Sequence, residues 1–352
     1  MQISLLFGEI ALKKKILVVF TGGTIGSETE GNNVSLDVKS RKALISAYRA
    51  RTHGDIEFDE VSPVNVLSEN VQPSDLKKIY DCVAAADTSL YDGVIITHGT
   101  DTLCFTVNWF SQVFCDYPLP IVFVSALYPL TDNRSNGVTN FSGAVDFIEK
   151  TGLHGVYCAF ANEWENCKIH LGSRLTYPSE ISGHYYSALN AYLAEIVNGE
   201  VIFNQSPYLP TLEQIKNNRK KGCDPALSGG VILITMRSLL NFAVYDFDEV
   251  KPNAVIIELS HSGTICTQGD NLNFLRFADY CKKCGVEVII GPVMSRAKVY
   301  DSMKHLPDNV KISYDMTIEM TVAKVMSALG AHLDADAYFD DNRAFEKINF
   351  PL

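Results

Sequence analysis

Catalytic chemistry is suggested first by a glycine-rich loop, Thr21–Gly26, that follows the apolar run ILVVF. Its glycines allow a sharp turn and bring backbone N–H groups close to a ligand, so that the hydroxyl of Thr24 would point into a cleft. The loop lacks the Gly-Lys-Ser/Thr of a phosphate-binding loop and the third glycine of a dinucleotide fingerprint. A glycine-rich turn after a strand is as often structural as catalytic, so this loop alone favours neither role.

A second loop of the same kind, His98–Thr102, follows the apolar run GVIIT. It places the hydroxyl of Thr100 directly before the carboxylate of Asp101, ahead of a predicted helix. The alternative is a helix cap, for which Thr102 or Asp101 would suffice, because such residues normally satisfy the first N–H groups of a helix. His98 is a candidate general base, although a histidine at a strand end is more often a structural group.

A third polar group, Ser68-Glu69-Asn70, follows the strand-like run VSPVNVL. A serine and a carboxylate at the end of a strand could bind the α-amino and α-carboxylate groups of an amino acid. The alternative is a turn that leads into a helix capped at Ser74.

The elements that must position these loops follow from the hydrophobic pattern. Short apolar runs alternate with amphipathic stretches, which predicts an α/β fold with an open, mostly parallel sheet flanked by helices. Ligands of such sheets bind at the carboxyl ends of the strands, where these loops would lie. The predicted strands are 16–20, 94–97, 120–124 and 155–160, and the predicted helices are 74–86, 102–114 and 137–150.

Two domains are expected, because 352 residues exceed what one hydrophobic core usually organises. Prolines, glycines and the basic cluster Lys216–Lys221 interrupt the pattern, as is typical of a solvated linker. We predict a larger N-terminal α/β domain over residues 1–205, a linker over 206–229 and a smaller C-terminal α/β domain over 230–352. In the second domain, strands are predicted at 231–235, 254–258 and 286–290, with helices at 271–283 and after Thr317.

Composition disfavours several classes of function. The formal charge of −11 opposes binding to nucleic acid or to anionic membranes. No apolar run reaches the ~20 residues of a membrane span, and the first fifteen residues do not follow the order of a secretory signal. We interpret them as a disordered extension or as a start codon placed too early. Nine scattered cysteines, including a lone CxxC at Cys281 and Cys284, predict free thiols in a reducing cytoplasm and no metal site.

Taken together, TGGTIG, SEN and THGTDT resemble the signatures of bacterial-type L-asparaginases and asparaginase-glutaminases, in order and approximate spacing. The resemblance extends over nearly the whole chain, and YDMT with its helix is similar to the cytoplasmic (type I) branch. It implies that Thr24 is the nucleophile and Thr100 the second active-site threonine. Asp101 would bind the α-amino group of the substrate, and Ser68 and Glu69 would hold its α-carboxylate and amino ends.

The sequence departs from the family pattern at three places. The lysine that follows Gly-x-Arg, and activates the second threonine in the family, is replaced by Tyr177, and the nearest lysine is Lys168. The stretch Ser27–Leu36, where the family has a lid tyrosine, contains none. The family's Ala-Asp-Gly-Pro becomes Ser135–Val138, which removes a carboxylate.

The resemblance therefore implies a cytoplasmic amidohydrolase that converts L-asparagine, or L-glutamine, to the acid and ammonia, with no cofactor. A homodimer or homotetramer is expected, with Ser260–Gly263 either lining the contact between protomers or forming a plain turn. Loss of the lysine and the lid tyrosine motivates an alternative, a non-catalytic amino-acid-binding or sensing homologue. A third interpretation, the amidase component of a tRNA-dependent amidotransferase, would require an extra N-terminal domain, whereas about fifteen residues precede the first predicted strand.

Overall fold

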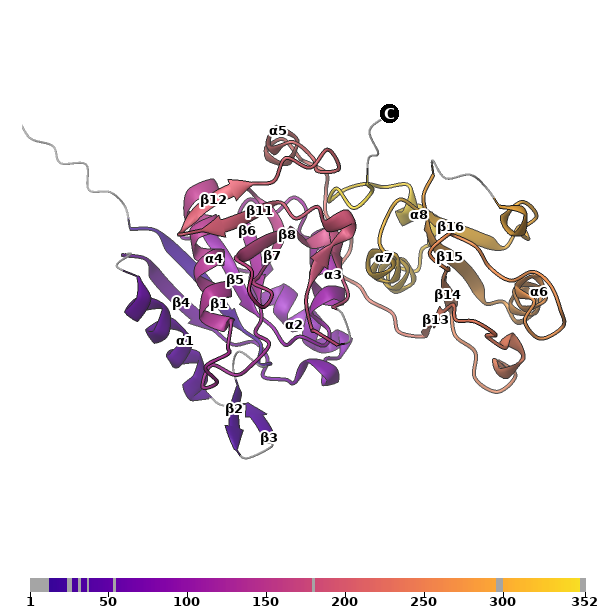
Figure 1. The fold of residues 1–352 in the computed structure, drawn as a ribbon, viewed down its shortest axis with the longest axis horizontal. Helices are drawn as coiled ribbons and strands as arrows, with labels where there is room; N and C mark the ends of the chain where they lie inside the picture. Colours follow the sequence, from indigo (N-terminus) through magenta and orange to yellow (C-terminus); the bar gives the residue numbers. More distant parts are fainter. Residues whose placement is uncertain are drawn as a thin grey trace, which may run out of the picture.

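Two sheets organise the chain in the computed structural model, which describes residues 13–23, 27–30, 33–36, 38–52, 55–178, 181–295 and 300–348. The larger sheet has eight strands in the order β12-β11-β8-β7-β6-β5-β1-β4, and the second has four in the order β13-β14-β15-β16. Figure 1 shows them in two bodies side by side, with helices α3 and α7 on the facing sides.

The larger sheet is parallel over its central strands and antiparallel at one edge. Strands β1, β4, β5, β6 and β7 pair in parallel, whereas β8, β11 and β12 are added antiparallel. The strands are β1 Lys15–Phe20, β4 Glu57–Val61, β5 Gly93–Thr97, β6 Pro120–Val124, β7 Gly155–Phe160, β8 Cys167–Leu171, β11 Ala194–Val197 and β12 Glu200–Phe203. Helices cover both faces, so the central strands β1, β5 and β6 are almost wholly buried and apolar.

The helices divide between the two faces of this sheet. Helices α1 (Val38–Arg51) and α4 (Gly137–Thr151) contribute to one apolar core, and α2 (Pro73–Ala84) and α3 (Leu103–Val113) contribute to the core on the other face. The crossovers β5–α3–β6 and β6–α4–β7 run in the same direction along the sheet. Because their helices lie on opposite faces, one of these two crossovers has the hand opposite to the usual right-handed form.

This topology positions the polar loops. The chain leaves β5 toward the face of α3, whereas it leaves the neighbouring strands β1 and β6 toward the face of α1 and α4. Loops that diverge in this way open a crevice at the carboxyl ends of the strands, which is where open α/β sheets bind ligands. The loop after β5 is therefore the one that diverges from the loops on both sides of it, at the edge of the sheet where a ligand is expected to bind.

The second sheet is wholly parallel. Its strands are β13 Val231–Thr235, β14 Ala254–Glu258, β15 Glu287–Val293 and β16 Val310–Tyr314. Helix α6 (Phe274–Cys284) covers one face, and α7 (Ile318–Gly330) covers the other, as its apolar spacing predicts. Helix α7 also packs on α3 of the first body, where Gln112 Nε2 approaches Met320 Sδ at 3.1 Å.

Smaller elements complete the chain. The antiparallel pair β2–β3 follows β1 and the pair β9–β10 follows β8. A segment over residues 340–348 returns between the two bodies, where Arg174 Nε donates to Phe345 O at 2.6 Å. The bounds are β2 Ser27–Glu30, β3 Asn33–Leu36, β9 Leu175–Thr176, β10 Tyr186–Ser187, α5 Leu212–Lys216 and α8 Asp336–Phe339.

The predicted fold class is confirmed, and one predicted strand is wrong. The run VSPVNVL was expected to be a strand, but β4 ends at Val61, the first residue of the run, and after it only Val66 bridges the sheet, to Gly22. Pro63 has no N–H to donate to a neighbouring strand. The side-chain hydroxyl of Ser62 donates to Phe20 O and Val64 O at this point.

No described helix is long and apolar enough to cross a membrane. All nine cysteines are described, and each is a free thiol.

Candidate active site

The loops after β1 and β5 touch through their glycines. A Cβ atom on Gly23 would lie 2.4 Å from Gly99 Cα, and the Gly23 φ of +77° disfavours any side chain. Gly22, with a φ of +103°, packs equally closely on Val66 O. Each glycine of TGGT is therefore required by the close approach of another backbone segment, Val66 for Gly22 and Gly99 for Gly23. The predicted nucleophile Thr24 lies outside the described residues.

Ser68 and Asp101 meet directly. Ser68 Oγ donates to Asp101 Oδ2 at 2.8 Å and accepts from Asp101 N at 3.2 Å. The hydroxyl of Thr102 donates to Ser68 O at 3.0 Å. Ser68 is buried, Thr100 is half-buried, and Asp101 and Glu69 are exposed at the surface. The structure thus brings together the loops of the predicted Ser68, Glu69, Thr100 and Asp101.

The helix-cap interpretation of these polar residues is wrong. Helix α3 begins at Leu103, and the side chain of its N-cap residue, Thr102, makes no capping hydrogen bond. The Thr102 hydroxyl and the Asp101 carboxylate bind Ser68 instead, because the two loops lie side by side. The predicted cap at Ser74 is also wrong, since α2 begins at Pro73 with a capping box formed by Gln72 and Asp75.

His98 is a buried structural group. Its Nδ1 lies 2.8 Å from Gly99 O, and because a carbonyl can only accept, Nδ1 carries the proton. Burial lowers the pKa of His98 to about 4, so the ring is neutral near pH 7. Ser125 Oγ donates to His98 O at 2.7 Å, and this hydrogen bond connects the loop after β6 to the loop after β5. This geometry supports the structural alternative for His98.

Two phenols hold the backbone of the loop after β5. Tyr177 Oη donates to Asp101 O at 2.8 Å, and Tyr185 Oη donates to Thr100 O at 2.6 Å. Burial raises the pKa of both phenols, so both are protonated near pH 7. Sequence reasoning missed Tyr185, because an aromatic residue in an irregular stretch carries no local signal.

Lys168 is engaged elsewhere. Its Nζ pairs with Glu165 Oε2 at 2.6 Å and lies 5.0 Å from the centre of the Tyr192 ring. It belongs to β8, which β7 and β6 separate from β5.

Asn136 joins two segments of the chain, at the position where the family resemblance implies an aspartate. Its Oδ1 accepts from Leu127 N at 2.9 Å, and its Nδ2 donates to Ala161 O at 2.8 Å. An amide both donates and accepts, whereas an ionised carboxylate can only accept. The substitution therefore allows one side chain to join the segments that follow β6 and β7.

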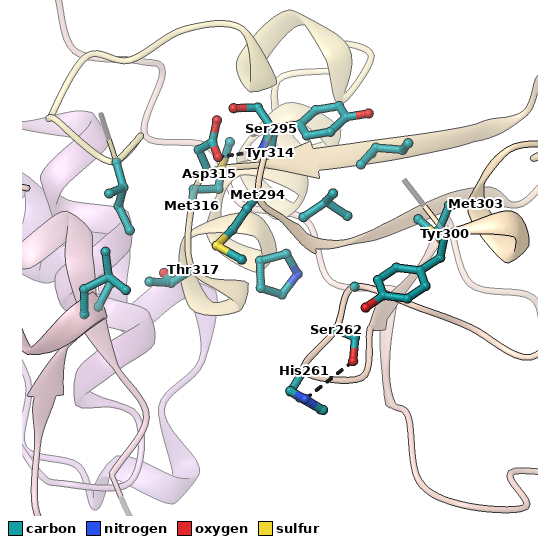
Figure 2. Close-up of a pocket in the computed structure, with 17 residues that line it drawn as sticks. His261, Ser262, Met294, Ser295, Tyr300, Met303, Tyr314, Asp315, Met316 and Thr317 are labelled. Carbon is teal, nitrogen blue, oxygen red and sulfur yellow. Dashed lines mark hydrogen bonds between the residues drawn. The ribbon is translucent and has the colours of Figure 1, made fainter. Parts of the chain in front are cut away.

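A separate cavity of about 340 Å³ lies at the carboxyl ends of β14, β15 and β16, and Ala188 and Leu189 of the first body complete its lining. Figure 2 shows His261 and Ser262 on one side, across from Ser295 and Asp315. The turn Ser260–Gly263 thus lines a cavity in part, while the described loop residues around Asp101 do not contribute to it. No group of three or more potential metal ligands occurs among the described residues.

An open α/β sheet with polar loops at a topological switch point is the usual scaffold of a small-molecule enzyme. A family model described as "Asparaginase, N-terminal" matches residues 15–209, more than half of the chain. The chain belongs to the asparaginase family, a class of amidohydrolases, and the predicted family is confirmed.

Individual relatives agree with this assignment. An L-asparaginase of Thermococcus kodakarensis is 29% identical over 329 residues, which cover 92% of this chain and 94% of the relative. The structure of the thermostable L-asparaginase from that organism aligns with a TM-score of 0.78 at 26% identity, over 96% of this chain and 100% of the other. The L-asparaginase 1 of Escherichia coli is 28% identical over 167 residues, which cover 47% of this chain and 47% of the relative.

Proposed function

We propose that this protein hydrolyses the side-chain amide of L-asparagine to aspartate and ammonia, with Thr24 as the nucleophile. The observation that carries the proposal is the contact between the two loops. Gly23, which precedes Thr24 in the chain, touches Gly99, which precedes Thr100. A hydroxyl on the first loop would then act beside the substrate-binding groups on the second.

The described residues offer the groups that an amino-acid substrate needs. The exposed carboxylate of Asp101, oriented by Ser68 Oγ at 2.8 Å, would take the α-amino group. Ser68 and Glu69 would hold the α-carboxylate and amino ends, as the family resemblance implies. The Thr24 hydroxyl would attack the amide carbon, the C–N bond would break to release ammonia, and water would then hydrolyse the ester to aspartate. Backbone N–H groups of the loops would stabilise the oxyanion.

Release of ammonia from L-asparagine and L-glutamine by the purified protein tests the proposal. We expect Thr24→Ala to reduce the rate by at least about 10³-fold, because the covalent step is lost, and Thr24→Ser to retain part of it. Full activity in Thr24→Ala would overturn the nucleophile assignment. The ratio of the two substrates decides between asparagine and glutamine.

One observation favours the second candidate, an amino-acid-binding or sensing homologue. The phenol of Tyr177, which the family resemblance aligns with the lysine, donates its hydrogen bond to the backbone carbonyl of Asp101, so it supplies no amine beside Thr100. Such a protein would show a higher melting temperature with aspartate or asparagine but would release no ammonia.

Assembly and location remain proposals. We propose a homodimer or homotetramer in the cytoplasm that acts on a small amino acid and binds neither nucleic acid nor membrane. The oligomeric state is measured by light scattering of the purified protein.

A further inference from the structure

The loop that carries Thr100 and Asp101 is supported from the second body of the molecule. Tyr177 N donates to Glu319 Oε1 at 2.6 Å, across 142 residues of sequence. Glu319 lies in the first turn of α7, and Tyr177 follows β9 in the first body. One carboxylate thus joins the second body to the residue whose phenol binds Asp101 O.

The segment before Tyr177 is fixed at each peptide. Asn108 Nδ2 donates to Leu175 O at 3.0 Å, and Cys104 Sγ donates to Thr176 O at 2.8 Å. Both side chains come from α3, which packs against α7. The Tyr177 N–H is the next backbone group along this segment, and Glu319 supplies its acceptor.

Glu319 is well suited to a fixed position. It stands at the N-terminal end of α7, where the helix dipole favours a carboxylate, while burial raises its pKa. The helix itself is anchored by Thr317, whose hydroxyl accepts from Met320 N at 3.2 Å. The acceptor that Tyr177 meets is therefore held by the fold of the second body.

We infer that Glu319 is a positioning residue for the Thr100–Asp101 loop and acts through Tyr177. Glu319 fixes the backbone of Tyr177, and the phenol of Tyr177 fixes the Asp101 peptide. Tyr185, which is 1% exposed, fixes the Thr100 peptide independently from within the first body. The expected effect of Glu319 on kcat/KM rests on the proposed function, whereas its expected effect on the position of the loop does not.

A double-mutant cycle tests the inference. Glu319→Ala and Tyr177→Phe should each lower kcat/KM by roughly 5- to 10-fold, the effect of one lost hydrogen bond in a site of this kind. Together they should lower it no further than either alone, because both break the same connection. Effects that multiply in the double variant would overturn the inference.

Two further variants separate positioning from folding. Glu319→Gln keeps an acceptor for Tyr177 N and should restore kcat/KM to within about 2-fold of the original chain. Glu213→Ala removes another first-turn helix carboxylate, on α5, and should have no effect on kcat/KM. A loss in Glu319→Gln as large as in Glu319→Ala would contradict the proposed role.

Hydrogen exchange provides a readout that does not require turnover. Peptides that contain residues 99–103 should exchange faster in Glu319→Ala and in Tyr177→Phe, to the same extent, and no faster in the double variant. Unchanged exchange in both variants would overturn the inference. If the original chain releases no ammonia while these exchange effects appear, the proposed function fails and the positioning role stands.

Discussion

At the scale of single residues, burial sets the ionisation of two histidines, each of which has one short-range partner. His98 donates from Nδ1 to the adjacent Gly99 O, and His170 Nδ1 lies 2.8 Å from Ser187 Oγ. Both rings are almost fully buried, and burial lowers their pKa values, to about 4 for His98 and about 3 for His170. Such a histidine does not reduce the stability of the fold while the same side chain is also neutral in the unfolded chain.

This ionisation predicts acid sensitivity. An unfolded histidine has a pKa of ~6.5, so between that pH and about 4 the unfolded state binds a proton that folded His98 does not. The contribution of neutral His98 to the free energy of unfolding is fully present above pH ~6.5. It decreases as the pH falls, by up to about 3 kcal/mol. The free energy of unfolding of His98→Asn, measured in urea at several pH values, should therefore approach that of the original chain toward pH 4. A difference that does not change with pH would contradict this origin.

At the scale of elements, two loops approach too closely for any side chain. Gly23 and Gly99 make this contact, and Gly99 in turn faces Ser68, whose Oγ would lie 2.4 Å from a Cβ on Gly99. The three loops therefore form one packed unit at the carboxyl ends of β1, β4 and β5. The unit contains residues of the TGGT, SEN and THGTDT motifs.

We predict that Gly23→Ala damages this unit. The new Cβ would meet the Gly99 backbone at 2.4 Å and force the loops apart. We expect ammonia release to fall by about 10²-fold and the free energy of unfolding by about 1–3 kcal/mol. Gly229→Ala is the matched control, because no atom lies within 4 Å of its added Cβ. Equal behaviour of the two variants in ammonia release and urea unfolding would contradict the packing argument.

At the scale of the whole molecule, a buried ion pair joins α7 to the returning C-terminal segment. Lys324 Nζ lies 2.6 Å from Glu346 Oε1, and both side chains are 0% exposed. Glu346 Oε2 also accepts from Ala344 N at 2.8 Å. Because Ser173 Oγ donates to Ala344 O at 2.6 Å, the same segment holds the first body.

Removing one partner of this pair should destabilise the protein strongly. Lys324→Met leaves the Glu346 charge buried without its cation, which costs about 3–5 kcal/mol. Lys324→Met combined with Glu346→Gln removes the charge and should recover most of the loss, as measured by urea unfolding and by the melting temperature. A double variant no more stable than Lys324→Met would show that the charge is not the cause.

The sequence by itself determined the local features of this protein. Strands β6 and β7 have their predicted bounds, because continuous apolar runs bounded by turn residues are a local signal. The motifs TGGT, SEN and THGTDT likewise identified the family and the candidate site, since each is a short run of neighbouring residues. The antiparallel strands β8, β11 and β12 were missed, because their mixed polar and apolar residues give a weaker pattern.

Only the tertiary structure decided how these pieces support one another. Helices α3 and α4 pack on opposite faces of the sheet, and this arrangement makes the loops diverge. It depends on the path of the whole chain. Tyr177 reaches Asp101 across 76 residues, and Tyr185 reaches Thr100 across 85. Such partners share no local pattern, because a hydrogen bond between distant residues depends on where the folded backbone places its donor and acceptor. The candidate groups were therefore evident from sequence, whereas their positioning was set by the fold.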